Sequence, residues 1–593
     1  MTKKRFSKQV NLTDNANLIA EKRYLKLEAD GSVKESVNEM FTRVARFIAS
    51  GDLDLSDKSE SYKKPSQSEL EEIEDSFYEI QANLEFLSGM SLLDRGKQDL
   101  VAACYVLPIK DSIESIYGTL ANAVVLHRRG AGIGYDFSEI RPEGDIVNTT
   151  GREASGPISF MKLYDYSSEV IMNRGAVRHA GHMGILRIDH PDVRKFLSAK
   201  QDNTQLTNFN ISIAITDEFI DALEKNTEYE LKHEGKVYGK ILAKEMLTEI
   251  AESIHKSGEP GFIFVDEINR HNPTLHVGLM TSTNQCGEQP LLPYEACNLG
   301  SVVLNKFVIK GTDNKKTHDR IDWDRLEYVV KTAVHFLDNT ITVSRHLLPE
   351  IEKLVKHGNR KIGVGVMGWA DMLYELNIPY NSQEALDLAE QIMGFIKEKG
   401  HEKSQELGKL KGDFGNFKGS KWHKEGYTNM RNATVTTIAP TGTTSLLANC
   451  NGGIEPFFAL AYIRKNMETM GDTEMIYVNE LLEQKLKDEW LYDKELMRNI
   501  AEKGTLSSFN QIPERIRKVY VCSFDIEPEW HIRMQAAFQK FTDNAVSKTI
   551  NLPESASTED IISAFKLAAK LGLKGLTIYR DKSRDQQVLN LTK

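Results

Sequence analysis

Three side chains with chemical potential stand at alternate positions of one short segment: Asn284, Cys286 and Glu288. In extended backbone, a period of two places all three on one side of the chain. Gly287 and Pro290 argue against a regular central strand, so we predict a tight extended loop that presents the trio. There the sulfur is suited to one-electron or nucleophilic chemistry, the carboxylate to accepting a proton, and the amide to holding a substrate hydroxyl.

The spacing alone leaves a second chemistry open, because a cysteine hydrolase also uses an activated thiol. Such an enzyme needs a partner histidine and an oxyanion loop, and neither is obvious around Cys286. Residues far apart in sequence can meet in a fold, so sequence separation does not decide between the two chemistries.

The other cysteines give little support to disulfide or zinc structure. The chain has five cysteines, an odd and sparse set, and no CxxC or Cys/His pair has the spacing of zinc ligands. We therefore predict no metal site. Taken singly, each thiol is expected to be a small buried apolar residue, and Cys450 and Cys522 keep that expectation.

The composition is that of an acidic globular protein. Among 593 residues, 75 Lys and Arg stand against 85 Asp and Glu, a net charge of -10, so we expect no general binding to nucleic acid or anionic membrane. The basic N-terminus has no apolar run behind it, and the longest uncharged stretch, 432–454, is rich in Thr, Asn and Gly. We expect no membrane span and a cytoplasmic location.

Two regions differ in their patterning. Residues 1–95 are polar with amphipathic helical spacing, which predicts a helical N-terminal region. From residue 96 to 593, short β-rich runs alternate with helical patterns, which predicts a large α/β unit with parallel strands. Within it, residues near 465–527 carry few strand signals and are expected to form a helical excursion.

A glycine motif, Gly363 to Gly368, matches GxGxxG after an expected strand. The following helix is short and no second apolar strand arrives where a nucleotide-binding βαβ unit needs one. We therefore predict that these glycines serve close strand packing and not a dinucleotide.

Family resemblance rests on many blocks in the same order. Asn284-x-Cys286-x-Glu288 is followed by Gln-Pro-Leu, Pro-Tyr-Glu and Cys297. Other blocks are ACYVLPIKDSIESI, RGAGIGYDFSEIRPEGDIV, GHMGILRIDHPD, TNFNISIAITDEF, APTGTTSLLANCNGGIEPFFALAYIR and GLTIYRDKSRDQQVL. Together they resemble the catalytic chain of ribonucleotide reductase, most closely the adenosylcobalamin-dependent class II enzymes.

The resemblance implies a ten-stranded α/β barrel with Cys286 at the tip of a central finger loop. It implies that Cys286 becomes a thiyl radical that abstracts the ribose 3'-hydrogen, that Glu288 takes the 3'-hydroxyl proton, and that Asn284 binds the substrate. Cys104 and Cys297 match the pair that supplies two electrons and closes a disulfide. The substrate is then a ribonucleotide and the product a 2'-deoxyribonucleotide.

A phosphate site is expected after the strand-like run NATVTTIA. Hydroxyls and free N–H groups at a helix start suit an anion, although simple helix capping explains the same residues. The resemblance favours substrate phosphates for Pro440, Thr441, Gly442, Thr443, Thr444 and Ser445. Ser155 and Gly156 resemble a second segment that contacts the substrate phosphates in the family.

An allosteric site is also implied, at the interface of a homodimer, for a deoxynucleotide or ATP effector. Asp111 matches an effector contact, and residues 174–184 and 200–208 resemble the two effector loops, giving Arg178, Lys200 and Gln201 as candidates. Here the chain departs from the family pattern, with Arg178-His179 where paired arginines are usual and His182 where a small amide is common.

The source of the radical follows from the last strand-like block. Tyr579 stands alone there, whereas chains that take their radical from a ferritin-like partner carry a tyrosine pair, so adenosylcobalamin is favoured. The sequence shows no CxxC tail and no ATP-binding cone, so we expect an external, thioredoxin-like or separate thiol reductant. The alternatives are a class I-like subunit with a ferritin-like partner and a catalytically silent deoxynucleotide-sensing chain.

Overall fold

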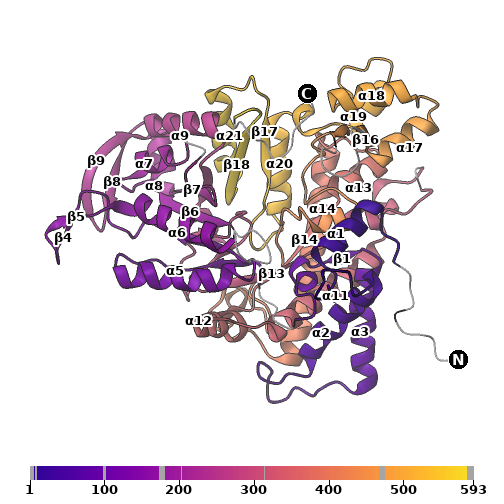
Figure 1. Cartoon of the computed structure of the whole chain (residues 1–593), viewed down its shortest axis with the longest axis horizontal. Helices are drawn as coiled ribbons and strands as arrows, with labels where there is room; N and C mark the ends of the chain where they lie inside the picture. Colours follow the sequence, from indigo (N-terminus) through magenta and orange to yellow (C-terminus); the bar gives the residue numbers. More distant parts are fainter. Residues whose placement is uncertain are drawn as a thin grey trace.

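The computed structural model describes residues 6, 10–97, 102–172, 181–201, 204–312, 314–465 and 474–583. An N-terminal helical region and a strand barrel account for most of them (Figure 1). Among these residues, no helix combines the length and apolar character needed to cross a membrane.

The N-terminal region consists of short helices with well-defined starts. Its elements are α1 (Asp14–Arg23), α2 (Val37–Ala49), α3 (Gln67–Ala82), β1 (Phe86–Leu87) and α4 (Gly89–Leu93). At α2, Ser36 and Glu39 form a reciprocal capping box that satisfies two free N–H groups. The apolar face of α2 then buries Phe41, Val44 and Ile48.

The first half of the barrel has five parallel strands: β2 (Cys104–Val106), β3 (Gly132–Asp136), β6 (His182–Arg187), β7 (Phe209–Ile215) and β10 (Gly261–Phe264). The accompanying helices are α5 (Ile113–His127), α6 (Gly156–Met172), α7 (Val193–Ser198), α8 (Asp217–Lys225), α9 (Ala243–Ser257) and α10 (Val265–Arg270). Two hairpins are attached, β4 (Ile146–Val147) with β5 (Arg152–Glu153) and β8 (Glu228–His233) with β9 (Lys236–Leu242).

The second half runs antiparallel to the first. Its strands are β13 (Ala296–Val303), β14 (Ile362–Met367), β17 (Thr549–Leu552) and β18 (Gly575–Arg580). Between β14 and β17, residues 434–438 form single parallel bridges to Val364 of β14 and to Val546, three residues before β17. Its helices are α11 (Trp323–Val343), α12 (Pro349–Ile351), α13 (Trp369–Leu376), α14 (Gln383–Lys411), α15 (Lys421–Lys424), α16 (Thr444–Ala448), α20 (Pro528–Gln539) and α21 (Thr558–Lys570).

Two antiparallel contacts join the halves into a ring. β13 pairs with β2, and β10 pairs with β18. With residues 434–438 counted as a member, the five strands of each half close a ten-stranded ring. β1 lies outside the ring, although it pairs with β13 and belongs to the same 10-stranded sheet. The predicted ten-stranded α/β barrel is therefore confirmed.

Gly363 and Gly365 of the glycine motif lie on β14 and serve packing, as predicted, and Gly368 precedes α13. A Cβ at Gly365 would overlap the carbonyl oxygen of Thr437, and one at Gly363 would overlap the Thr437 side chain. These positions have no room for a side chain because residues 434–438 pass directly alongside β14.

The excursion near 465–527 differs from the expectation at its start. It contains α17 (Glu480–Asp488), α18 (Lys494–Lys503) and α19 (Glu514–Val519), but a hairpin of β15 (Ala461–Lys465) and β16 (Glu474–Val478) precedes them. Both strands are five residues long, too short for their period-two pattern to stand out from the helical sequence that follows.

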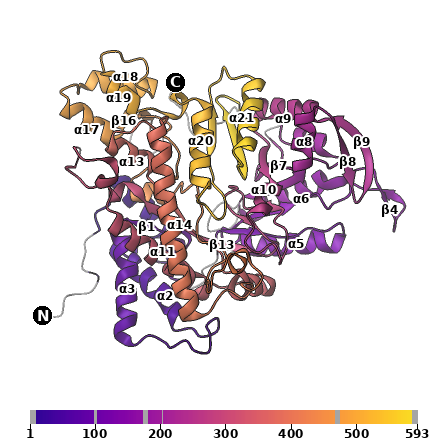
Figure 2. The same cartoon turned by 180° about the vertical axis from the view of Figure 1, so that it is seen from behind.

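The N-terminal region is fastened to the barrel by a buried ion network. Arg360 donates to Asp57 at 2.6 Å and to Asp338 of α11 at 2.9 Å, while Lys411 lies 2.5 Å from Asp52. Burial alone would raise the pKa of Asp338, but Arg360 and other nearby cations outweigh burial and lower it. Removing one partner would leave a buried charge unpaired, which is costly. Figures 1 and 2 show the N-terminal helices beside α11, away from α5 and α6.

A loop enters the barrel between β11 (Ser282–Thr283) and β12 (Pro290–Leu291), which form a short antiparallel pair. It passes directly over β3, where a Cβ at Gly134 would overlap the carbonyl oxygen of Thr283 and one at Gly132 would overlap the Gln285 side chain. On the far side, Asn210 of β7 donates its amide to the carbonyl of Gln285 at 2.8 Å. The sequence expectation of a central finger loop corresponds to this segment.

Substituting Gly134 should therefore displace the loop. We expect Gly134→Ala to lower the free energy of unfolding by about 1–3 kcal/mol, because the added methyl group has no space beside Thr283. Gly239→Ala in β9 is the matched control, since no atom lies within 4 Å of its Cβ position; its effect should stay within about 0.5 kcal/mol. Denaturant unfolding measures both, and equal effects would contradict this packing.

Candidate active site

Two of the five cysteines face each other across the junction between the barrel halves. Cys104 of β2 and Cys297 of β13 are direct partners in the antiparallel register, and both are buried. Directly opposed residues in antiparallel strands have Cα atoms roughly 4.5–5.5 Å apart. That separation lies inside the range of about 4.4–6.8 Å found for disulfides. No disulfide joins the two thiols in this structure, but their register places them to form one without backbone movement.

The finger loop brings its predicted trio to this pair. A turn bonds Gly287 N to Asn284 O at 3.1 Å and leaves Cys286 at the loop tip, half-buried. The Asn284 amide lies 3.1 Å from the sulfur of Cys104, and Oε1 of Glu288 lies 3.9 Å from the same sulfur. Residues separated by 180 positions or more thereby share one site.

Hydrogen bonds hold Asn284 and Glu288, the two residues of the trio that flank Cys286. The carbonyl of Glu288 accepts from Thr437 Oγ1 at 3.0 Å and from Ala545 N at 3.0 Å, both in the second half of the barrel. Asn284 Oδ1 accepts from Gln289 N at 3.1 Å. Asn284 and Glu288 are almost completely buried, so their positions are fixed by the surrounding strands.

A buried polar cluster lies next to Cys297. Glu295 accepts from Lys361 at 2.6 Å and from the Asn359 amide at 2.5 Å. Burial raises the pKa of Cys297 well above its usual value, although the charge of Lys361 opposes the shift. Cys297 is therefore a protonated thiol near neutral pH, which keeps its hydrogen available.

The arrangement can perform a two-electron reduction next to a one-electron centre. Cys104 and Cys297 can give up two electrons as a disulfide forms, while Cys286 stands separately on the loop tip. Glu288 is within reach of the same space and can accept or return a proton. Among the described residues, no group of three or more His, Cys, Asp or Glu side chains suits a metal ion.

The expected phosphate loop lies at the carboxyl end of residues 434–438. Thr441 has a left-handed backbone (φ 55°), and its hydroxyl accepts from Gly453 N at 2.8 Å, which folds the loop back before α16. In the described part of the chain, no partner is found for the N–H groups of Gly442, Thr443 and Thr444. Such unpaired N–H groups suit an anion.

A second helix start stands beside this loop and was not predicted from the sequence. At α4, the Cβ position of Gly89 lies 3.2 Å from the Thr444 side chain. Ser88, which precedes the helix, donates to the carbonyl of Leu299 at 2.9 Å and lies 3.1 Å from the Ser91 hydroxyl. The Ser-Gly-x-Ser spacing before a short apolar run was the available signal.

Ser155 and Gly156 lie elsewhere. Gly156 begins α6, on the path that leaves the carboxyl end of β3, and its Cβ position is close to Asp192 and Glu143. Because the two halves run antiparallel, this is the opposite end of the barrel from Thr441. The structure does not bring these two segments together.

The expected effector residues have partners within the chain. Asp111 accepts from Arg141 at 2.6 Å, Lys200 is paired with Glu259 at 2.9 Å, and Gln201 accepts from Lys256 at 3.0 Å. Arg178 and His179 lie outside the described residues. His182 is buried beside His127, at 3.3 Å, and contacts Ser168. Burial lowers its pKa, so it is a neutral core residue.

Tyr579, the single tyrosine of the last block, lies beside the end of α9. Its ring lies 3.1 Å from the Cβ position of Gly258, which ends α9. The next residue, Arg580, donates to the carbonyls of His255 and Glu554, each at 3.0 Å. Neither side chain has a described contact with the finger loop.

Comparisons with known proteins agree with this geometry. A family model described as the ribonucleotide reductase barrel domain matches residues 102–579, and one described as the all-alpha domain matches residues 10–89. A vitamin B12-dependent ribonucleoside-diphosphate reductase of Thermoplasma acidophilum is 42% identical over 98% of this chain and 80% of that protein. A protein of the same description from Mycobacterium tuberculosis is 39% identical over 98% of this chain and 81% of that protein.

A solved structure shows the same fold. The Actinobacillus ureae class Id ribonucleotide reductase alpha subunit superposes with a TM-score of 0.74, at 22% identity, over 96% of this chain and 97% of that one.

The cysteine register makes a redox prediction. Mild oxidation with diamide should link Cys104 to Cys297, because the two residues are already in register. Peptide mass spectrometry should find this bond in the unmodified chain and lose it in Cys104→Ser. Cys522→Ser is the control and should leave the bond unchanged. A dominant bond between other cysteines would contradict the register.

Proposed function

Because this chain belongs to the ribonucleotide reductase family, we propose that it reduces ribonucleotides to 2'-deoxyribonucleotides, with adenosylcobalamin as its radical generator. One observation carries the proposal: Cys104 and Cys297 are opposed in register beneath a loop that presents Cys286 between Asn284 and Glu288. The descriptions of two relatives as vitamin B12-dependent ribonucleoside-diphosphate reductases support the cofactor and a diphosphate substrate.

The residues divide the reaction between them. The Cys286 thiyl radical takes the 3'-hydrogen of the ribose, and Glu288 takes the proton of the 3'-hydroxyl. The 2'-hydroxyl leaves as water after protonation by one thiol of the Cys104/Cys297 pair. The pair then supplies two electrons and closes a disulfide, and Cys286 returns the 3'-hydrogen. In total, a ribonucleotide and two thiols give a deoxyribonucleotide, water and a disulfide.

The candidate site fits the cofactor at the tip of the finger loop. Asn284 and Glu288 are buried, whereas Cys286 is half-buried, so the sulfur is the reactive atom open to a group from outside. When bound, adenosylcobalamin supplies the carbon-centred radical that removes hydrogen from this thiol. Tyr579 is a single tyrosine followed by Arg580, whose side chain donates to the carbonyl of His255, and this favours adenosylcobalamin over a tyrosine pair that relays a radical from a partner subunit.

The substrate phosphates are proposed to bind between two helix starts. The unpaired N–H groups at 442–444 and the start of α4 are adjacent, as the Gly89–Thr444 contact shows. Anions are stabilised at such positions by the N–H groups and by the helix dipole. After turnover, an external thiol, from a thioredoxin-like protein or a small molecule, is proposed to reduce the disulfide.

A homodimer through α5 and α6 is proposed from an exposed apolar surface. Ile113, Tyr117 and Val125 are 59%, 51% and 42% exposed along one side of α5, and Tyr166 and Val170 are 66% and 53% exposed on α6. The spacing of four or eight residues places them in one stripe on each helix. Apolar stripes on adjacent helices mark an interaction surface.

The dimer also explains the placement of the effector candidates. Asp111 precedes α5, whereas Lys200 and Gln201 precede β7 at the other end of the barrel. The 15 residues of α5 span about 22 Å, so one chain does not bring these residues together. In a two-fold dimer with antiparallel helices, the start of α5 in one protomer lies near the end of α5 in its partner. We therefore propose that a deoxynucleotide or ATP effector binds between protomers.

Turnover should need cobalamin and no second protein. Under anaerobic conditions with adenosylcobalamin, dithiothreitol and a ribonucleoside diphosphate, we expect formation of the deoxyribonucleotide. Cys286→Ser should reduce the rate at least about 1,000-fold, because the O–H bond of serine is much stronger than the S–H bond of cysteine and does not yield the radical. Cys450→Ser is the matched control and should remain active.

Effector binding shows whether the Cys286→Ser variant is folded but inactive or misfolded. The affinity of this variant for a deoxynucleotide effector should equal that of the unmodified chain. Product formed by this variant, or product that appears only with a metal-bearing partner subunit, would refute the radical source proposed here.

The apolar stripe makes an association prediction. Tyr117→Arg places a charge in the proposed interface, and we expect the dimer dissociation constant to rise at least about tenfold. Trp490→Arg is the control, because Trp490 is 94% exposed on the excursion. Analytical ultracentrifugation measures both variants, and an unchanged dimer in Tyr117→Arg would exclude this interface.

A further inference from the structure

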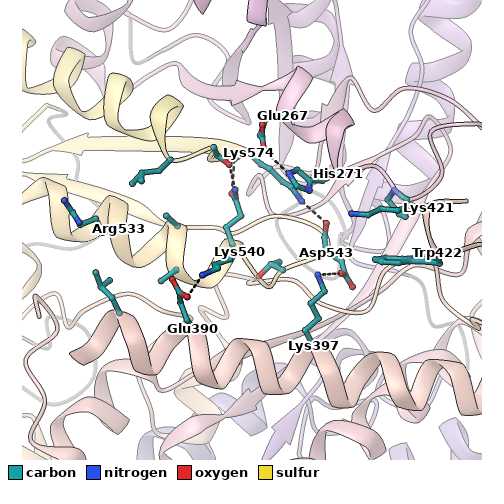
Figure 3. A pocket seen from close by; sticks show the side chains of 18 of the residues that line it. Glu267, His271, Glu390, Lys397, Lys421, Trp422, Arg533, Lys540, Asp543 and Lys574 are labelled. Atoms are coloured by element: carbon teal, nitrogen blue, oxygen red, sulfur yellow. Dashed lines mark hydrogen bonds and ion pairs between the residues drawn. The ribbon is translucent and has the colours of Figure 1, made fainter. Parts of the chain in front are cut away.

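A cavity lies at the end of the barrel opposite the phosphate loop. It has a volume of about 510 Å³ and lies between α14, α15, α20 and the residues that precede β18 (Figure 3). Glu267, from the helix that follows β10, and Lys574, which precedes β18, both line it. These strand ends are opposite to the carboxyl end of residues 434–438, so the cavity is separate from the site described above.

The cavity is cationic within an acidic chain. The charged residues that line it are Lys397, Lys421, Arg533, Lys540 and Lys574, against Glu267, Glu390 and Asp543. Five cations face three carboxylates, a formal excess of two in a chain that carries -10, and Arg533 is also paired with Glu529 at 2.6 Å outside the lining. The cations come from four separate segments, and Figure 3 shows Lys397, Lys421 and Lys574 around Asp543, with Lys540 turned toward Glu390. A local reversal of sign of this kind favours an anionic ligand.

Lys574 is the least compensated of these cations. It is 5% exposed, and its ammonium group donates to the carbonyls of Asp543 at 2.8 Å and Asn544 at 2.5 Å. In the described part of the chain, no carboxylate lies within 4.0 Å of its nitrogen. Burial lowers the pKa of Lys574 to about 7, because two neutral carbonyls do not replace the lost hydration. A bound anion would supply the missing counter-charge.

The other residues that line the cavity indicate which further groups its ligand carries. Leu386, Leu571 and the Trp422 side chain give an apolar surface, and Glu267 and Glu390 can accept hydrogen bonds from hydroxyl or amino groups. The volume lies within the range of about 300–1,000 Å³ that small-molecule sites occupy, far larger than a single ion needs.

We propose that this cavity binds a small phosphorylated metabolite, with its phosphate directed to Lys574, Lys397 and Lys421. Lys397 now lies 3.4 Å from Asp543 and Lys421 lies 3.9 Å from Glu425, so both are loosely paired and free to turn toward a phosphate. Thr542 and Asp543 line the site, and Ala545, two residues further on, donates to the carbonyl of Glu288.

Inorganic pyrophosphate is the probe for this site. In isothermal titration calorimetry with the full chain, we expect a binding event that weakens at least tenfold in the double variant Lys397→Gln/Lys421→Gln. Lys403→Gln is the matched control, because Lys403 is also on α14 and ion-paired, with Glu406 at 3.0 Å, but does not line the cavity. Sodium chloride at equal ionic strength should not reproduce the heat.

Hydrogen exchange locates the event, since pyrophosphate can also bind the phosphate loop. Pyrophosphate should slow exchange in peptides that cover 542–548 and 571–576 in the unmodified chain and in Lys403→Gln, but not in the double variant. Protection near 440–445 should persist in all three. The proposal is overturned if the unmodified chain shows no protection at 542–548 and 571–576, or if the double variant binds as tightly there as Lys403→Gln.

Discussion

An antiparallel contact only two residue pairs long joins β2 to β13, and the placement of the candidate site depends on it. It closes one of the two junctions between barrel halves, and one of its pairs is Cys104 with Cys297. A register shift of one residue would turn one sulfur to the opposite face of its strand. β1 pairs with the second half of β13, at Ser301 and Val302, and β14 pairs with β13 along most of the length of β13. These neighbours hold the register of β13.

The position of the finger loop depends on two residues without side chains. Backbone can pass over β3 only because Gly132 and Gly134 carry no Cβ, and the carbonyl of Glu288 is then held by Thr437 and Ala545 from the other half. Both halves of the barrel thus contact the loop, which sets Glu288 and Asn284 against the sulfur of Cys104. Rigid support of this kind is what allows a loop to present reactive groups accurately.

Much of the architecture was predictable from local patterns. Alternating strand-like and helical runs indicated the α/β unit, and the resemblance supplied the number of strands. The pairing of β15 with β16 was missed because five-residue strands give a weak signal.

The sequence analysis was weaker wherever a contact joins distant segments. The proximity of α4 to Thr444 and the distance of Gly156 from it both follow from the antiparallel arrangement of the halves, which no local pattern reveals. His182 was assigned to an effector loop by resemblance, yet it is a core residue because β6 begins there. Lys397, Lys421 and Lys574 all line the cationic cavity. They are far apart in the sequence, so no local pattern predicts that they share one site.

The attachment of the N-terminal helices has a consequence for how such a chain can evolve. They share a sheet with the barrel through β1, bury Asp52 and Asp57 against barrel cations, and place α4 beside Thr444. A recombination event near residue 95 would therefore separate α4 from Thr444. It would also leave buried charges without their partners in both products. Shuffling of this region as an independent cassette is disfavoured, and the two segments are expected to be inherited together.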